Sequence, residues 1–237
     1  MRHWIKTRLS PRSVVFLRCM ARGLPWPRWG NLRRTRPFSE TFGFDRGTPV
    51  DRYYLHRFLE RQRESITGRV LEIQSPGHAL RYGHHLTATD SIDIDPVHRP
   101  TYVCDLAASA GVVPDASYDC FLLPNTLAHL RDLEGSLREA LRIVRPGGTI
   151  LASTGTFVPL IPDAADYWHL SAQGWREVVG RVWQGHDVQV EQHGNCLSAV
   201  AAMLGLANEE LTREELDAQD PRYPVLVTVA CRVSERP

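Results

Sequence analysis

The stretch from Leu137 to Ser153, LREALRIVRPGGTILAS, constrains the fold most strongly, because it joins an amphipathic helix, a tight turn and a buried strand without a break. Apolar residues recur at helical spacing from Leu133 to Val144, and charged residues lie off that face. Pro146 disfavours helical geometry at Arg145, and the two glycines that follow permit a reversal into an apolar strand. A helix that leads directly into a buried strand predicts a doubly wound α/β domain.

The rest of the chain continues this alternation of strands and helices. Strands are predicted at 69–73, 91–94, 101–103, 118–123 and 149–153, and helices at 50–64, 126–130, 133–144 and 171–182. Segments 186–192 and 225–233 are rich in β-forming residues and end the chain as an antiparallel pair. We therefore expect a Rossmann-like sheet that is mostly parallel and carries an antiparallel C-terminal hairpin.

The beginning of the chain differs from the rest in charge. Residues 1–39 contain ten arginines and lysines and no acid, which leaves 18 basic and 27 acidic residues in the remainder. Trp4, Trp26, Trp29 and Phe38 are interleaved with these cations. We expect residues 1–45 to form a basic N-terminal arm and residues 46–237 to form the α/β domain. The arm suits an anionic membrane surface or a nucleic acid, or it folds back onto the acidic body.

Cysteine usage and hydropathy bear on the compartment. The five cysteines form no C-x-x-C pair, and Cys104 and Cys120 fall inside predicted strands, which favours buried thiols in a reducing environment. No apolar run is long enough to cross a bilayer or to serve as a signal-peptide core. We therefore expect a cytoplasmic protein.

Several kinds of chemistry lack their usual signatures in this chain. There is no G-x-S-x-G nucleophile elbow and no P-loop, which argues against hydrolase and nucleotide-phosphate chemistry. The ten histidines, including His78, His84 and His85, show no ligand spacing with a cysteine or carboxylate partner, so no metal site is expected.

Acidic residues instead follow three successive predicted strands. Glu72 ends the first strand, Asp93 lies near the end of the second in SIDIDP, and Asp105 follows the third in YVCD. Parallel sheets bind ligands at the carboxyl ends of their strands. An ionised carboxylate offers only hydrogen-bond acceptors, so it can bind ribose hydroxyls or an adenine amino group. The pattern predicts a nucleoside-containing cofactor.

Five segments resemble the class I S-adenosylmethionine (SAM) dependent methyltransferases over roughly residues 46–233: RVLEI, IDIDP, VCDL, YDCFLLPNTLAHL and RIVRPGGTILAS. The segments RGTPVDRYYLHRFL and NEELTREELDAQDPRYPVLVTV are also similar to a narrower bacterial subgroup that is often found beside glycan-assembly proteins. The resemblance implies a seven-stranded sheet, an enzyme, SAM as the methyl donor and S-adenosylhomocysteine as the product.

The resemblance also implies which residues hold the cofactor. Glu72 would meet its amino group or order the adjacent loop, and Asp93 would bind the ribose. Asp105 with Leu106 would contact the adenine, and Arg46 its carboxylate. The cluster around Arg46 is equally consistent with a surface helix held by salt bridges. The complete set of expected cofactor residues is Glu72, Gly77, Asp93, Ile94, Asp105, Leu106, Asn125 and Arg46.

The loop after the first predicted strand departs from the family pattern. The family has a glycine-rich turn here, whereas this chain reads Glu-Ile-Gln-Ser-Pro-Gly-His from Glu72 to His78. Gly77 is the only glycine left, and Pro76 removes a backbone donor. The subgroup shares this loop, which favours a rearranged cofactor site over a dead one.

Methyl transfer to a hydroxyl requires alignment of the acceptor and removal of a proton. His129 lies one helical turn beyond Asn125 and is the first candidate base, because its ordinary pKa near 6.5 suits this task. His169 is the second candidate, and with Tyr167 and Trp168 it is expected to line the acceptor pocket. We expect O-methylation of a sugar, a glycoside or a small secondary metabolite. The alternatives are methylation of a nucleic acid through the basic arm, and a repurposed fold that acts as a cyclase or a partner module.

Overall fold

The structure of this protein, a computed structural model, describes residues 10–157, 159–160 and 165–235. It divides between Arg36 and Pro37 into two compact units. This division lies ahead of the boundary expected at 45/46, because residues 37–45 pack within the second unit. There the amide of Phe38 donates to the carbonyl of Leu204 at 2.7 Å, and the side chain of Ser39 is buried.

The described part of the first unit, residues 10–36, contains one helix, α1 (Pro11–Ala21), and a 3-10 turn, η1 (Gly30–Leu32). Ser10 caps α1 by accepting a hydrogen bond from the amide of Ser13 at 3.2 Å. Phe16 packs edge-on against Trp26, with ring centroids 5.0 Å apart. Trp4 lies outside the described residues. In the described part of the chain, every helix is too short or too polar to cross a membrane.

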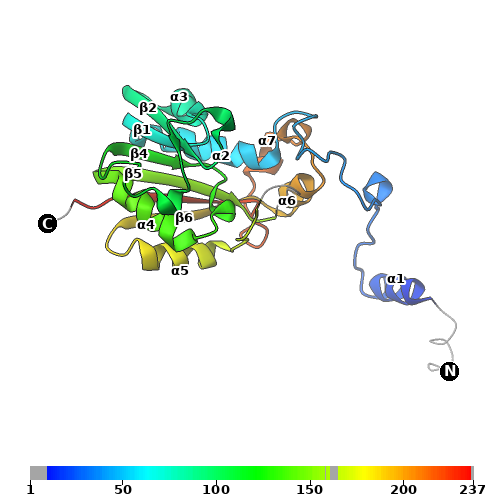
Figure 1. Cartoon of the computed structure of the whole chain (residues 1–237). Coiled ribbons are helices and arrows are strands. Elements are labelled where there is room, and N and C mark those ends of the chain that lie inside the picture. Colours follow the sequence, from blue (N-terminus) through cyan, green and yellow to red (C-terminus); the bar gives the residue numbers. More distant parts are fainter. Residues whose placement is uncertain (1–9, 158, 161–164, 236–237) are drawn as a thin grey trace. The chain divides into compact units, whose positions relative to one another are not determined.

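The second unit is built on a seven-stranded sheet with the order β3-β2-β1-β4-β5-β7-β6 (Figure 1). The first five strands along the chain run parallel to one another, while β7 is antiparallel to both β5 and β6. The strands are β1 (Gly68–Ile73), β2 (Leu86–Asp93), β3 (Tyr102–Val103), β4 (Tyr118–Leu123), β5 (Val144–Gly155), β6 (Asp187–His193) and β7 (Leu226–Arg232).

Two layers of helices enclose this sheet. One layer is formed by α2 (Val50–Arg61), α3 (Gly77–Tyr82), α6 (Cys196–Met203) and α7 (Arg213–Asp217), and the other by α4 (Leu133–Ile143) and α5 (Ala172–Val182). The connections include the short 3-10 helices η2 (Arg63–Ser65), η3 (Pro96–His98), η4 (Leu106–Ala108), η5 (Leu127–His129) and η6 (Asn208–Glu210).

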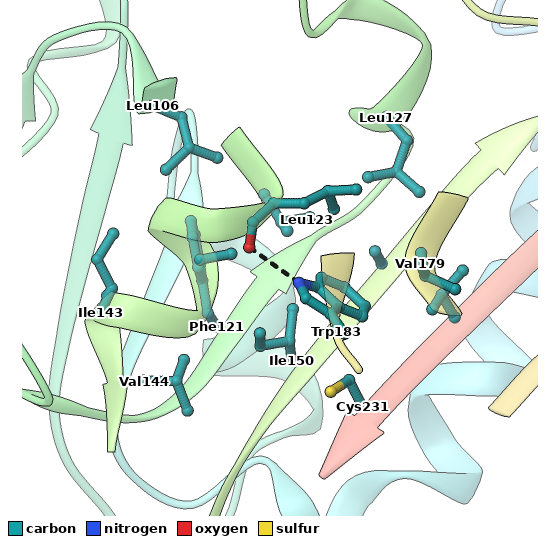
Figure 2. Packing of buried hydrophobic residues seen from close by; sticks show 14 of the residues in the cluster. Leu106, Phe121, Leu123, Leu127, Ile143, Val144, Ile150, Val179, Trp183 and Cys231 are labelled. Atoms are coloured by element: carbon teal, nitrogen blue, oxygen red, sulfur yellow. Dashed lines mark hydrogen bonds between the residues drawn. The ribbon is translucent and has the colours of Figure 1, made fainter. Parts of the chain in front are cut away.

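The central strands are apolar on both faces because each face is covered by helices. In β4, Phe121 and Leu123 belong to the core under α4 and α5, while Cys120 and Leu122 belong to the core under α2. Figure 2 shows the first core, in which the indole of Trp183 packs among β-strand side chains and donates from Nε1 to the carbonyl of Leu137 at 2.9 Å. The central strands are therefore packed on both faces.

The fold confirms the predicted sheet and its antiparallel hairpin, and it corrects several element boundaries. The Pro-Gly-Gly segment is not a free turn: β5 already begins at Val144 and pairs with Tyr118, and its register then shifts before Thr149 pairs with Cys120. Gly147 adopts φ +77° and donates from its amide to the carbonyl of Val233 at 2.8 Å. The helix predicted at 126–130 is only the 3-10 turn η5, and helices α3, α6 and α7 were not predicted.

Candidate active site

A cavity of about 330 Å³ opens at the carboxyl ends of β1, β2 and β4. The strand order reverses between β1 and β4, and open α/β sheets bind their ligands at such a switch point. Its walls come from the start of α2, the β1–α3 loop, the end of β2 and the residues after β4. The lining residues are Arg52, Leu55, Glu72, Ile73, Gln74, Ser75, Gly77, His78, Asp93, Pro124, Asn125, Thr126 and His129.

Glu72 fixes the short helix α3 at the edge of this cavity. Its side chain is 1% exposed and accepts hydrogen bonds from the amides of His78 at 3.1 Å and Ala79 at 2.9 Å. The Nδ1 atom of His78 lies 2.6 Å from the same carboxylate. Both oxygens are thus engaged at the N-terminal end of α3, where a negative charge is favourable. Of the two roles expected for Glu72, this geometry corresponds to ordering the loop.

In the glycine-poor loop between β1 and α3, the chain turns at Gln74. This residue adopts φ +69°, a conformation that glycine occupies at much lower cost, and its amide donates to the carbonyl of Ile92 at 2.9 Å. Gly77 lines the cavity, and a Cβ atom added there would meet only the Ser75 hydroxyl, 3.9 Å away. No neighbouring protein atom therefore requires glycine at this position, and the space beside it is available to a ligand.

The predicted adenosine residues divide into two groups. Asp93 lines the cavity, and its Oδ1 accepts a hydrogen bond from the amide of Asp95 at 3.0 Å. Asp105 instead caps η4 by accepting from the amide of Ala107 at 2.9 Å, and Leu106 is buried in the core. The side chain of Ile94 is exposed to solvent. Asp105, Leu106 and Ile94 lie outside the lining of the cavity as the structure describes it.

A second cavity, of about 210 Å³, adjoins the first and is mostly apolar. Aromatic, proline and small aliphatic side chains form most of its wall, and polar groups gather where it meets the first cavity. The lining residues are Phe42, Phe44, Pro49, Val50, Asp51, Arg52, Asn125, Ala128, His129, Thr154, Gly155, Pro159, Asp166 and Ala202.

Arg52, Asn125 and His129 line both cavities and mark their junction. Asn125 adopts φ +48° directly after β4. Its amide donates to the hydroxyl of Ser153 at 2.8 Å, and that hydroxyl donates to Asn125 Oδ1 at 3.0 Å. Asn125 Nδ2 donates to Asp51 at 2.8 Å, and Asp51 also pairs with Arg52. This network holds the start of α2 against the ends of β4 and β5.

The ring of His129 has a defined orientation and tautomer. Its Nδ1 lies 2.7 Å from the carbonyl oxygen of Ala165, and a carbonyl oxygen only accepts hydrogen bonds. Nδ1 therefore carries a proton, which leaves Nε2 of the neutral ring as an acceptor. The 165–168 segment is in turn held by the amide of Tyr167, which donates to the carbonyl of Ala128 at 2.8 Å. His129 thus has the geometry of a base at the junction.

His169 is outside the lining of both cavities in the described structure. Its Nε2 is 2.9 Å from Oδ1 of Asp166, and its Nδ1 is 3.4 Å from the carbonyl oxygen of Thr156. The side chain of Asp166 is 5% exposed and lines the apolar cavity. Asp166 therefore contributes a buried carboxylate to the wall of this cavity, with His169 as its neighbour.

Arg46 is engaged elsewhere. Its guanidinium makes a bidentate ion pair with Glu210, with Nε 3.0 Å from Oε2, and it lines neither cavity in the described structure. This contact raises the pKa of Arg46 and lowers that of Glu210. Arg52, from the same arginine and tyrosine cluster, is the cation that reaches the first cavity.

Phe42 and Phe44 fall within the N-terminal arm expected from the sequence, but in the structure they line the second cavity. Ser39 organises their loop: its hydroxyl donates to Asp45 and accepts from the amide of Gly43 at 3.0 Å. The hydrogen bond from Ser39 lowers the pKa of the Asp45 carboxyl. The change in charge after Arg36, where acids first appear, was the available signal that the arm ends there.

The strand order, with an antiparallel β7 inserted between β5 and β6, and the paired cavities at the carboxyl edge define a Rossmann-like fold of the class I methyltransferase type. A SAM-dependent methyltransferase from Archaeoglobus fulgidus is similar at 16% identity with a TM-score of 0.53, over 82% of this chain and 100% of that chain. A SAM-dependent methyltransferase from Mesorhizobium loti is similar at 16% identity with a TM-score of 0.52, over 74% of this chain and 96% of the other. The [4+2]-cyclase SpnF is similar at 16% identity with a TM-score of 0.52, over 94% of both chains.

Residues 77–152 match the family model described as "Methyltransferase domain". No curated protein matches the sequence significantly. The chain therefore has the class I methyltransferase fold, as predicted, and the central part of this fold matches a methyltransferase domain. The assignments of individual site residues stay predictions.

Proposed function

We propose that this protein is a SAM-dependent O-methyltransferase acting on a small molecule. The supporting observation is the pair of adjoining cavities at the switch point of the sheet, one polar and one mostly apolar, with Arg52, Asn125 and His129 at their junction. A transferase needs this arrangement, because donor and acceptor must meet in line while the rest of each molecule is held apart.

The polar cavity suits the donor. Asp93 keeps one carboxylate oxygen available for ribose hydroxyls, the guanidinium of Arg52 matches a carboxylate, and the open space at Gly77 permits close approach to the backbone. SAM, when bound, supplies an electrophilic methyl group on a sulfonium. The glycine-poor loop fits this role because Gln74 takes the left-handed conformation and Glu72 secures the helix that follows.

The apolar cavity narrows the acceptor. A bare sugar carries hydroxyls all around its ring, and each would need a polar partner when buried. Phe42, Phe44, Val50 and Ala202 offer none, so among the three expected acceptor types the lining favours a hydroxyl on an apolar secondary-metabolite framework. A glycoside then fits only with its sugar outside the cavity. The apolar wall also excludes water from the reacting hydroxyl.

His129 is the proposed base. Its protonated Nδ1 is held by Ala165, so Nε2 is the atom that would take the hydroxyl proton as the oxygen is methylated. Asp166, with His169 at its Oδ1, also lines the acceptor cavity and is the competing base. His129→Gln and Asp166→Asn separate these assignments: the correct one lowers kcat by about 100-fold or more and leaves SAM affinity unchanged.

Calorimetric titration with SAM and with S-adenosylhomocysteine tests the donor site. Asp93→Ala is expected to weaken binding roughly 100-fold, because about 3 kcal/mol is lost with two hydrogen bonds to a charged acceptor. Asp187→Ala, which removes an exposed carboxylate at the start of β6, is the matched control and should bind as the unaltered protein does. The absence of SAM binding to the unaltered protein would refute the proposal.

The basic first unit supports a second candidate, methylation of a nucleic acid. Residues 10–36 carry seven arginines and no acid, which suits a phosphate backbone or an anionic membrane surface. This candidate requires salt-sensitive RNA or DNA binding that is lost when residues 1–36 are deleted. Methylation of a small acceptor by the shortened protein at full rate would exclude it.

A third candidate is a repurposed domain that binds SAM without transferring its methyl group. The similarity of the fold to that of a [4+2]-cyclase supports this candidate, together with the departure of the Gln74–Gly77 loop from the glycine-rich pattern. Mass spectrometry of reactions with apolar hydroxylated acceptors distinguishes the two: a methylated product supports transfer, and a rearranged acceptor of unchanged mass supports cyclisation.

A further inference from the structure

A third cavity lies between α2, α5 and β6, and it shares no lining residue with the two cavities of the active site. Its volume is about 650 Å³. Tyr53, Arg57 and Arg61 occupy one face of α2, because each is four residues from the next. Arg176 reaches the cavity from α5, across the outer edge of β6.

Two of the three guanidinium groups in this cleft are paired with carboxylates. Arg57 contacts Asp217 and donates to the hydroxyl of Tyr53 at 2.9 Å. Arg61 Nη2 lies 2.6 Å from Glu191 Oε2. These ion pairs are partly exposed, so each leaves other N–H groups directed at the cleft or at solvent.

Arg176 differs from the other two. Its Nη2 donates to the carbonyl of Val190 at 3.0 Å, and no carboxylate of the described residues lies within ion-pair distance of it. That carbonyl belongs to the edge strand β6, which pairs only with β7 in the sheet, so the contact fixes the guanidinium beside the cleft without neutralising it. A cation held in one place before binding loses less side-chain entropy when a ligand arrives.

The balance of charge in the cleft is positive. Three guanidinium groups face two carboxylates, Glu191 and Asp217. His193 adds no charge at neutral pH, because burial lowers its pKa to about 4. One positive charge therefore lies in a concave site whose other walls are tyrosine, glutamine and histidine side chains with hydrogen-bonding capacity.

We propose that this cleft is a binding site for the phosphoryl group of a small anionic ligand. A phosphoryl group offers three oxygens and up to two negative charges to the planar forks of Arg61, Arg176 and Arg57, whereas a carboxylate ligand has two oxygens and one charge. The volume of the cleft, about 650 Å³, suits a compact ligand such as a sugar phosphate or a nucleoside diphosphate. The site does not depend on the proposed methyl transfer.

Two substitutions with opposite expected effects test the site. Arg176→Gln removes the unneutralised cation and should weaken phosphate binding about tenfold, as for one lost charge-assisted hydrogen bond. Glu191→Gln removes the competing carboxylate, frees Arg61 and should strengthen binding by several-fold. If Arg176 and Glu191 only stabilised the fold, Glu191→Gln would not bind phosphate more tightly than the unaltered protein. Arg181→Gln is the matched control, since it removes an exposed arginine of the same helix that pairs with Glu134 outside the cleft.

The full-length protein is titrated calorimetrically with pyrophosphate, glucose 1-phosphate and ADP, and thermal melting confirms that each variant is folded. Tightest binding of glucose 1-phosphate assigns the site to sugar phosphates, and tightest binding of ADP that persists in Asp93→Ala assigns it to nucleoside diphosphates. The proposal is overturned if none of the three ligands binds when it is present at about 10 mM, because a Kd above that concentration corresponds to a binding free energy weaker than about 3 kcal/mol. It is also overturned if Arg176→Gln and Arg181→Gln weaken binding equally.

Discussion

Replacing Glu72 by glutamine tests whether the carboxylate under α3 is what holds the donor loop in place. Glutamine has the same shape, but only one of its two terminal atoms accepts a hydrogen bond. In the structure Oε1 accepts from His78 and Oε2 accepts from the amide of Ala79 at 2.9 Å. The substitution therefore sets an NH₂ group against an N–H donor at a side chain that is 1% exposed.

The expected loss follows from these contacts. One hydrogen bond to a charged acceptor is removed, worth about 1.5–3 kcal/mol, and one buried amide loses its partner, which costs about 1–3 kcal/mol. Because the two terms overlap, we expect the free energy of unfolding to fall by about 3 kcal/mol. For a domain of this size that corresponds to a fall in Tm of about 6–12 °C.

Urea unfolding measures this loss, followed by the fluorescence of the buried Trp175 and Trp183. The midpoint should fall while the slope with urea stays constant, because the folded and unfolded surfaces are unchanged. SAM affinity should fall as well, at a temperature where the variant is still folded. Glu64→Gln is the control, since Glu64 is 87% exposed at its ion pair with His84. A change in Tm below about 1 °C would refute the role given to Glu72.

Three further results follow from the structure. Gly77→Ala should leave Tm unchanged or slightly raised, since the new Cβ meets only a hydroxyl 3.9 Å away. The same substitution should weaken SAM binding about tenfold or more in calorimetry, because it fills space proposed for SAM. A loss of Tm together with the loss of SAM affinity would contradict the proposal that Gly77 only leaves room for SAM. Phe44→Ala should raise the KM for the acceptor and leave the Kd of SAM unchanged, because Phe44 lines only the apolar cavity, and the reverse pattern would count against this division. Burial lowers the pKa of His193 to about 4, whereas a histidine in the unfolded chain titrates near 6.5. The contribution of neutral, buried His193 to the free energy of unfolding is therefore fully present above pH 6.5. It is lost as the pH drops toward 4, by up to about 1.4 kcal/mol per pH unit in urea titrations. If the free energy of unfolding of His193→Gln depends on pH as steeply as that of the unaltered protein, other groups cause the dependence.

The sheet was predictable because its signals are local. One contiguous stretch contains the helix from Leu133, the Pro-Gly-Gly segment and the apolar run of β5. This stretch alone predicted the α/β class and the order of helix and strand. Helix α6 was missed because CLSAVAAM has small and apolar residues all around and shows little amphipathic period. Helix α3 has six residues, too few for any periodicity to register.

The candidate site was predictable only in part. Glu72, Gly77, Asp93, Asn125 and His129 line the first cavity because they lie at or after the carboxyl ends of strands, a position that sequence order alone reveals. The partner of Arg46 was not predictable, since Glu210 lies 164 residues further along the chain and reaches it only through the fold. The wall of the second cavity was not predictable for the same reason, because Phe42 and Ala202 are far apart in the sequence and no local pattern connects them.

The end of strand β5 forms part of the wall of the second cavity. It has parallel partners on one side and antiparallel partners on the other over most of its length, and its side chains from Gly148 to Thr154 are buried or nearly so. Its amides should be among the slowest in the protein to exchange with deuterium, because they open only with the whole sheet. We therefore expect the wall of the second cavity that Thr154 and Gly155 form to stay fixed when the rest of the cavity fluctuates. The Phe42–Phe44 part of the wall lies outside the sheet and is attached by local hydrogen bonds, such as the one from the amide of Phe44 to the carbonyl of Thr41, so we expect its amides to exchange faster than those of β5.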